Sequence, residues 1–244
     1  MISDKFKGYL KDDHKTDQTI KTYLLHVNDY LKWFDHSTGA TFSKLQRPNI
    51  KEYISYLRNV KELQPQSINS KVSALIKFNT FLVDFGYQDD YVVQKSDMLK
   101  IQKKSSLYSK FDKRNIDQLL QTILDADSED AKRNYALACT LAYAGLRVSE
   151  ATHIKMKDFD LTSMEIAVWG KGDKCRKAEF NEKVKASLEA WLKDRKRRGI
   201  ESEYLFQSNR GKALDRTVVF KMINNHSKQI SLNITPHDLR HFYV

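Results

Sequence analysis

An apolar stripe with helical spacing near the start of the chain limits what the chain can fold into. Its members recur every three or four residues: Ile20, Tyr23, Leu24, Val27, Leu31 and Phe34. This spacing places them on one face of an α-helix, and that face must be buried against another element. Thr16 or Asp17 is suited to cap the start, and Gly39 follows the end. With only 8 Gly and 3 Pro in 244 residues, the chain is expected to form long helices rather than a turn-rich β structure.

Two further helices are predicted in the first block. One begins near Pro48 and carries Ile50, Tyr53, Ile54 and Leu57. The other starts after Pro65, stops at Gly86 and is predicted to bury Ile68, Val72, Leu75, Leu82 and Phe85. Its other face carries hydroxyls and lysines that suit phosphate contacts: Ser67, Ser70, Lys71, Ser73 and Lys77. An ordinary solvated helix face is the alternative interpretation.

Residues 88–110 show no sustained period and are rich in lysine, including Lys103 and Lys104. We interpret them as a basic linker that can follow a nucleic-acid backbone, the alternative being a plain solvated linker. The formal net charge of the whole chain is +11, with a pI near 9.4. Such an excess points to a polyanionic partner, with nucleic acid first and an acidic membrane surface second.

Several other classes of protein are disfavoured by the sequence. No apolar stretch approaches the roughly 20 residues that a membrane-spanning helix needs. The first residues, "MISDKFKGYLKDDHK", lack the apolar core of a signal peptide. Cys139 and Cys175 fit no metal-ligand spacing and are interpreted as reduced intracellular thiols. The protein is therefore expected in the cytoplasm.

Helical spacing resumes after the linker, at Ile116, Leu119, Leu120 and Ile123. A second helix is predicted from about Glu129 to Tyr143, and a third within "LRVSEATHIKMKDFD". The segment "SMEIAVWGKGDKCRKAEF" is typical of a β-hairpin, and a helix after it ends in the charge run "KDRKRR", interpreted as a solvated basic end. The fold class is thus mainly α with a small β-hairpin, divided into residues 1–87, a linker over 88–110, and residues 111–244.

Three short motifs in this chain could carry chemistry. In "YAGLRVSE", Gly145 permits a tight turn, Arg147 sits near a helix start, and Glu150 lies three positions on, where it can hold the guanidinium. Arginine suits phosphate because its planar fork donates parallel hydrogen bonds and keeps its charge. By itself, such a pair is also common as an ordinary surface ion pair.

The second motif, "GKGDK", places glycines on both sides of Lys171 at a predicted hairpin tip, which lets the tip approach a ligand closely. A lysine there can act as a mobile charge or a proton donor. Lys174 is a second candidate for the same role, and an ordinary turn with a solvated lysine is the alternative.

The third motif is "HDLRHFYV", at residues 237–244. In a helix His237, Arg240 and His241 share one face, which offers a fixed cation and two imidazoles that can change protonation near neutral pH. Leu239 is expected in the core. A metal site at the two histidines would need a third ligand that the sequence does not provide, so no metal is predicted.

The order of "GLRVSE", a glycine-flanked lysine and "HDLRH" in a basic two-block chain resembles the tyrosine recombinase (phage integrase) family, in its two-domain form. The resemblance implies a helical SAM-like core-binding domain in the first block. The polar face of residues 67–77 would make DNA contacts in that domain. It implies an α+β catalytic domain in the second. Members of this family cut and rejoin DNA through a 3′-phosphotyrosyl intermediate, without a metal or a cofactor.

The resemblance also implies residue roles. Arg147 and Arg240 would clamp the non-bridging oxygens of the scissile phosphate, with Glu150 orienting Arg147. Lys171 would donate a proton to the leaving 5′-oxygen, and His237 would accept or position the tyrosine proton. His241 would have a supporting role.

The implied partner is a double-stranded recombination site, on which the protein would assemble as a dimer or tetramer, with no membrane involved. The implied task is integration and excision of a mobile element or resolution of its cointegrates. The family places its nucleophilic tyrosine further downstream, so we expect a chain cut before that residue, which binds DNA without cleaving it. Tyr243 is interpreted as a buried aromatic residue and not as the nucleophile. A non-catalytic DNA-binding regulator derived from a recombinase is the alternative, and an unrelated basic helical protein would have to match three ordered motifs by chance.

Overall fold

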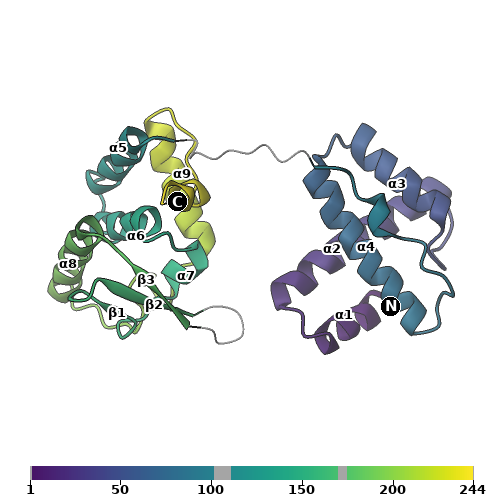
Figure 1. Ribbon diagram of the computed structural model, residues 1–244, viewed down its shortest axis with the longest axis horizontal. Helices are drawn as coiled ribbons and strands as arrows, with labels where there is room; N and C mark the ends of the chain where they lie inside the picture. The colour runs from purple at the N-terminus through teal and green to yellow at the C-terminus, as the bar shows by residue number, and fades with distance from the viewer. Residues whose placement is uncertain (1, 102–110, 170–174, 244) are drawn as a thin grey trace. The chain divides into compact units, whose positions relative to one another are not determined.

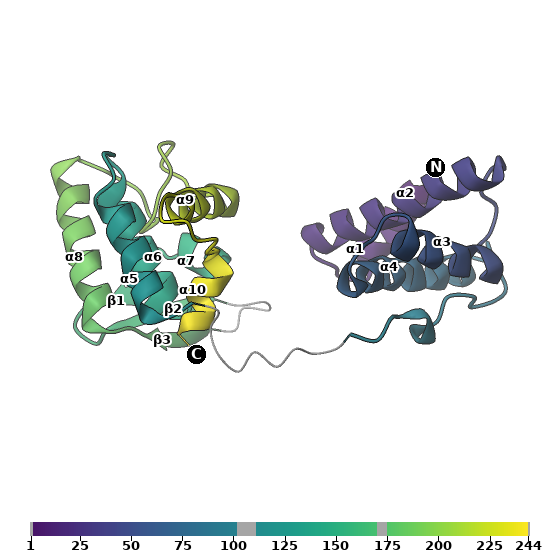
Figure 2. The ribbon, with the colours of Figure 1, turned by 90° about the horizontal axis from the view of Figure 1, so that it is seen from above.

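The computed structural model describes residues 2–101, 111–169 and 175–243. The chain divides into two compact units, residues 1–104 and 105–244. Each unit has its own apolar core and is described separately (Figures 1 and 2). No helix within the described ranges is both long enough and apolar enough to cross a membrane.

The described part of the first unit is helical. Its elements are α1 (Ile2–Asp12), α2 (Asp17–Thr38), α3 (Arg47–Asn59), α4 (Pro65–Asp84) and a short 3-10 turn, η1 (Lys95–Asp97). Thr16 caps α2 by accepting a hydrogen bond from the Thr19 amide, and Gly39 closes the helix in the left-handed conformation. Proline lies in the first turn of both α3 and α4, where its missing N–H costs nothing.

Helix α4 forms the centre of this unit, in contact with α1, α2 and α3. Phe78 is fully buried, and its ring lies 5.1 Å from that of Phe6 and 5.9 Å from that of Phe81. Helix α1, which supplies Phe6, was not predicted, because its eleven residues carry only a sparse apolar stripe between charges. The prediction that Phe85 is buried was wrong, since its side chain is 55% exposed.

The first part of the predicted linker packs against this unit. Val93 is buried, and its amide donates a hydrogen bond to the buried Asn79 of α4. Arg47 of α3 forms an ion pair with Asp97, and the Leu99 amide donates to Asn69. Residues 88–99 therefore pack on the first unit, so this part of the predicted linker is not free. Hydrogen bonds to isolated polar side chains fix these residues, and such bonds leave no periodic signal in the sequence.

The second unit combines helices with a three-stranded antiparallel sheet in the order β1-β2-β3. Its described elements are α5 (Lys113–Leu124), α6 (Ala131–Tyr143), α7 (Val148–Thr152), β1 (Phe159–Asp160), β2 (Glu165–Trp169), β3 (Cys175–Glu179), α8 (Glu182–Arg197), α9 (Arg216–Gln229) and α10 (Pro236–Phe242). The predicted hairpin is β2–β3, with Val168 opposite Arg176 and Trp169 opposite Cys175. The sequence did not predict β1 or α9.

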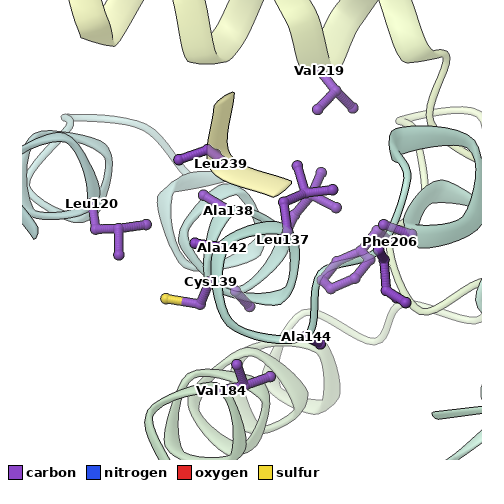
Figure 3. Close-up of a cluster of buried hydrophobic side chains, with 14 of the residues drawn as sticks. Leu120, Leu137, Ala138, Cys139, Ala142, Ala144, Val184, Phe206, Val219 and Leu239 are labelled. Atoms are coloured by element: carbon purple, nitrogen blue, oxygen red, sulfur yellow. The ribbon is translucent and has the colours of Figure 1, made fainter. Parts of the chain in front are cut away.

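Helix α6 is the centre of the second core, with α5, α7, α8 and α10 packed around it. It is buried on nearly every side, as expected for a helix without a polar face. Its alanines allow close approach of the neighbouring helices. Figure 3 shows Ala138, Cys139 and Ala142 of α6 surrounded by Leu120, Val184, Val219 and Leu239 from α5, α8, α9 and α10. Both cysteines are free, and burial raises the pKa of the Cys139 thiol to about 11.

The charge run at the end of α8 is not merely a solvated helix end. Arg195 is buried, and its guanidinium donates to the Tyr204 carbonyl at 2.7 Å and to Gln207 Oε1 at 2.9 Å. Asp194 is also buried and pairs with Arg197 at 2.7 Å. Arg195 ties the end of α8 to the following loop, and Asp194 pairs with cations at the end of its own helix. The prediction of a solvated run was therefore wrong for these two residues.

Replacing Phe78 tests the core of the first unit. We expect Phe78→Ala to lower the free energy of unfolding by about 3–5 kcal/mol, because it leaves a cavity under α4. The matched variant Phe85→Ala removes the same ring from an exposed position, and we expect it to cost no more than about 1.5 kcal/mol. Urea unfolding of both variants provides the measurement, and equal losses would contradict the burial assigned to α4.

Candidate active site

The first arginine of the site lies at the start of α7. Arg147 occupies the N-cap position, and Glu150, in the first turn, closes a capping box with it. The Glu150 carboxylate accepts the Arg147 backbone N–H on Oε2 and the Arg147 Nη1 on Oε1, both at 2.8 Å. The Arg147 side chain remains 65% exposed, so most of its N–H donors can reach a ligand. The predicted pairing of Arg147 with Glu150 is confirmed.

The second arginine comes from α10, far along the chain. Thr235 and Asp238 cap this helix, and the buried Leu239 anchors it to the core, as predicted. Arg240 donates from Nη1 to the carbonyl of Gly145, 95 residues earlier, at 2.6 Å. The same nitrogen lies 3.6 Å from Glu150 Oε2. Arg147 and Arg240 therefore converge on a single carboxylate.

Gly145 makes this convergence possible. Its φ is +61°, a conformation that side chains other than glycine rarely adopt. A Cβ at this position would lie 2.4 Å from Cδ1 of Tyr243, whose ring covers the glycine. The prediction that Tyr243 is buried was wrong, because the residue is 53% exposed at the C-cap of α10.

The two histidines of α10 form a pair. His237 Nε2 and His241 Nε2 are 3.0 Å apart, so one nitrogen donates a hydrogen bond that the other accepts. A shallow pocket of about 410 Å³ adjoins His237 and is lined also by Val148, Ser149, Arg216 and Phe220. Within the described ranges, no third candidate metal ligand joins the histidines.

Glu150 is the electrostatic centre of the site. Its side chain is only 8% exposed, and Arg176 of β3 donates to its Oε2 at 2.9 Å, in addition to the contacts with Arg147. Burial raises the pKa of the Glu150 carboxyl, but the hydrogen bonds from Arg147 and the charges of Arg176 and Arg147 outweigh it, so the pKa lies below its ordinary value. Arg176 was not predicted from the sequence; its only signal is its place on the strand after "GKGDK".

The other predicted site residues fall into two groups. Lys171, Lys103 and Lys104, with the alternative Lys174, lie outside the described residues. Two lysines of the polar face of α4, which was predicted to contact DNA, are paired with carboxylates: Lys71 with Asp29 of α2 at 2.6 Å, and Lys77 with Asp13 at 2.8 Å.

Two hydroxyls of this face of α4 also have partners. Ser73 donates to the Asn69 carbonyl within its own helix. Ser70, which is exposed, lies 3.2 Å from His26 Nε2. The acidic partners, Asp29 of α2 and Asp13 just after α1, could not be inferred from the period of α4 alone.

The exposed guanidinium of Arg147 and the partly buried guanidinium of Arg240 lie beside one buried carboxylate, an arrangement that can bind a tetrahedral oxyanion. Their forked donors match phosphate oxygens, and a fixed charge near an imidazole pair suits phosphoryl transfer. The fold and the site thus define a phosphoryl-transfer protein built on a helical unit followed by an α+β unit.

Comparison with known proteins gives the family. Residues 110–243 match the phage integrase family, and residues 2–85 match the phage integrase N-terminal SAM-like domain. The chain belongs to the phage integrase family of tyrosine recombinases, enzymes that exchange DNA strands. The family resemblance and the fold class inferred from the sequence are confirmed.

Related proteins are similar in sequence to this chain over nearly its whole length. It is 43% identical to the TnP I resolvase of Bacillus thuringiensis, over 99% of this chain and 84% of that protein. It is 31% identical to the tyrosine recombinase XerC of Staphylococcus saprophyticus, over 94% of this chain and 77% of the relative.

Solved structures share the fold. The Tn1549 transposon integrase in complex with circular intermediate DNA matches with a TM-score of 0.74 at 18% identity, over 99% of this chain and 85% of that one. A lambda integrase dimer bound to a COC' core site matches with a TM-score of 0.72 at 15% identity, over 98% and 83%.

A substitution at Gly145 tests the turn beneath Arg240. We expect Gly145→Ala to destabilise the protein by more than Gly199→Ala, which has a similar φ of +60° but no atom near its Cβ position. Gly199→Ala should show only the backbone cost of about 1–2 kcal/mol. The excess at Gly145 should disappear in the double variant Gly145→Ala/Tyr243→Ala, measured by thermal unfolding. An equal cost at both glycines would show that the Tyr243 ring does not restrict this turn.

The pH dependence of stability tests the Glu150 site. Because its pKa is lower in the folded state, the carboxylate contributes stability that is complete above its unfolded pKa of about 4.3 and is lost as pH falls through the lower folded value. The difference in unfolding free energy between wild type and Glu150→Gln should be constant from neutral pH to about pH 5 and should shrink below it. Glu189→Gln, at an exposed position of α8, serves as the control. A difference that persists unchanged in acid would contradict the lowered pKa.

Proposed function

We propose that this protein is a site-specific recombinase that cleaves and rejoins DNA strands, and that Arg147 and Arg240 bind the scissile phosphate. The observation that carries the proposal is their convergence on Glu150, with 2.8 Å and 3.6 Å between the guanidinium nitrogens and the carboxylate. A five-coordinate phosphorane carries one more negative charge than the diester. Two fixed guanidinium groups lower its energy more than that of the substrate.

The remaining roles follow from the chemistry of the reaction. A tyrosine hydroxyl that attacks phosphorus must lose its proton, and His237 on α10 is proposed to accept or position that proton. Its partner His241, 3.0 Å away, is proposed to hold the ring in place. Lys171 is proposed to protonate the leaving 5′-oxygen. The phosphotyrosyl bond conserves the energy of the broken ester, so rejoining requires no external energy source.

The proposed partner is a double-stranded recombination site. The net charge of +11 supports this proposal, as do the solved relatives bound to DNA, one of them as a dimer. We propose that this protein also assembles on DNA as a dimer or a higher oligomer. The 43% identity to a resolvase favours resolution of transposon cointegrates as its task. Action on such DNA would place it in the cytoplasm.

The first unit is proposed to bind DNA through the exposed end of α4, which carries Ser67 and Ser70. Lys71 and Lys77 would have to leave Asp29 and Asp13 to reach a phosphate. Lys103 and Lys104 are proposed to follow the DNA backbone. Overall affinity should fall steeply with salt, since contacts to phosphate release counterions.

Removing either arginine tests the phosphate clamp. We expect Arg147→Ala and Arg240→Ala each to slow covalent adduct formation on a nicked suicide substrate by about 10²–10³-fold, as for loss of one transition-state donor. The affinity for the same DNA, measured by fluorescence anisotropy, should change much less. Arg147→Lys should restore little, because lysine lacks the planar fork. The assay uses the whole protein as its gene encodes it.

Arg197→Ala is the matched control, since it removes an exposed arginine of α8 that pairs with Asp194. It should leave the adduct rate unchanged. Unaltered cleavage in Arg147→Ala/Arg240→Ala would rule out the clamp. A wild-type protein that binds the site and never forms the adduct would favour a non-catalytic DNA-binding regulator.

A further inference from the structure

The Glu150 carboxylate accepts hydrogen bonds from Arg147, a proposed phosphate-binding residue, and also from Arg176, which has no role in the proposed function. Oε1 accepts Arg147 Nη1 at 2.8 Å. Oε2 accepts the Arg147 backbone N–H at 2.8 Å and Arg176 Nη2 at 2.9 Å. Each carboxylate oxygen offers about two lone-pair sites. The two donors therefore fill Oε2.

Arg240 lies just beyond this filled oxygen. Its Nη1 is 3.6 Å from Oε2, which is too long for a hydrogen bond, and donates instead to the Gly145 carbonyl at 2.6 Å. One bond to a carbonyl holds the guanidinium while leaving most of its five donors for a ligand. The orientation of Arg240 thus depends on Oε2 having no vacant lone-pair site.

Loss of Arg176 would change the number of donors at Glu150 Oε2. Oε2 would keep a single donor and gain a free lone pair close to Arg240. A shift of less than about 1 Å would then convert the 3.6 Å contact into a charge-assisted hydrogen bond. Such a bond would draw Arg240 toward Glu150, away from Gly145 and from the position of the phosphate.

We propose that Arg176 is a positioning residue for strand cleavage: it occupies Glu150 Oε2 and so keeps Arg240 available for the scissile phosphate. This inference rests on the proposed function. Arg176 acts through Glu150 and Arg240, and it is distinct from the groups that would touch the reacting phosphate. It also links the β2–β3 hairpin to α7, because it lies on β3 opposite Val168 of β2.

A simpler interpretation is an exposed ion pair without functional effect. The Arg176 side chain is 46% exposed, and such pairs contribute little stability. The two interpretations differ in one respect: only a positioning role makes the effect of Arg176 depend on the charge of Glu150. A neutral glutamine at position 150 attracts Arg240 far less than the carboxylate does. A double-mutant cycle therefore separates them.

The experiment measures single-turnover adduct formation on a suicide substrate together with DNA affinity. We expect Arg176→Ala to slow the adduct step by about a hundredfold, the size expected for a misplaced reacting group. The Kd should stay within about fivefold, the range for loss of one exposed ion pair. Arg176→Lys keeps one donor for Oε2 and should recover most of the rate. Glu150→Gln/Arg176→Ala should be no slower than Glu150→Gln alone.

Lys177→Ala is the matched control, because it removes a positive charge from the next position of β3. Lys177 pairs with Glu165 at 2.6 Å and is 72% exposed. Its loss should leave the adduct rate within about twofold of wild type.

Several outcomes would overturn the inference while leaving the proposed function in place. These are a wild-type rate in Arg176→Ala, effects of Glu150→Gln and Arg176→Ala that multiply, or a loss of affinity as large as the loss of rate. A wild-type protein that forms no adduct overturns both proposals. Thermal unfolding confirms that each variant is folded.

Discussion

The buried carboxylate of Glu150 is the constraint around which the site is built. Arginines that lie close together repel one another, and the repulsion grows as water is excluded from them. A single negative charge beneath Arg147, Arg176 and Arg240 offsets that repulsion and leaves an excess of positive charge facing outward. In the proposed function, that excess would bind the scissile phosphate and stabilise the added charge of its transition state.

The core of the second unit fixes the positions of these three arginines relative to one another. Arg147 starts α7, Arg176 lies on β3 and Arg240 lies on α10. The central helix α6 packs directly against α7 and α10, and its alanines let them come close. Gly145 then ends the connection from α6 with a left-handed turn whose carbonyl receives Arg240. Packing at α6 thus sets the distance between two groups that lie 95 residues apart in the chain.

Features that depend on local spacing were predictable. The caps at Thr16 and Gly39, the helices after Pro48 and Pro65, and the β2–β3 hairpin follow from periodicity and from the conformations of glycine and proline. The pairing of Arg147 with Glu150 also belongs here, since one turn of helix brings them together. Features that depend on a distant partner were missed. Arg195 lies in a run of charges, yet it is buried because the carbonyls of residues 204 and 205 turn toward it.

The sequence by itself determined that this is a basic, mainly helical protein of two blocks, with three ordered motifs suited to a phosphodiester. Periods of three to four residues and short motifs act over one or two helical turns, and they survive in the linear order of the chain. Only the tertiary structure decided that Arg240 reaches Gly145, that Arg176 joins Glu150, and that Lys71 and Lys77 pair with Asp29 of α2 and with Asp13 just after α1. Those contacts join distant segments, and which charges meet is decided by how the helices pack.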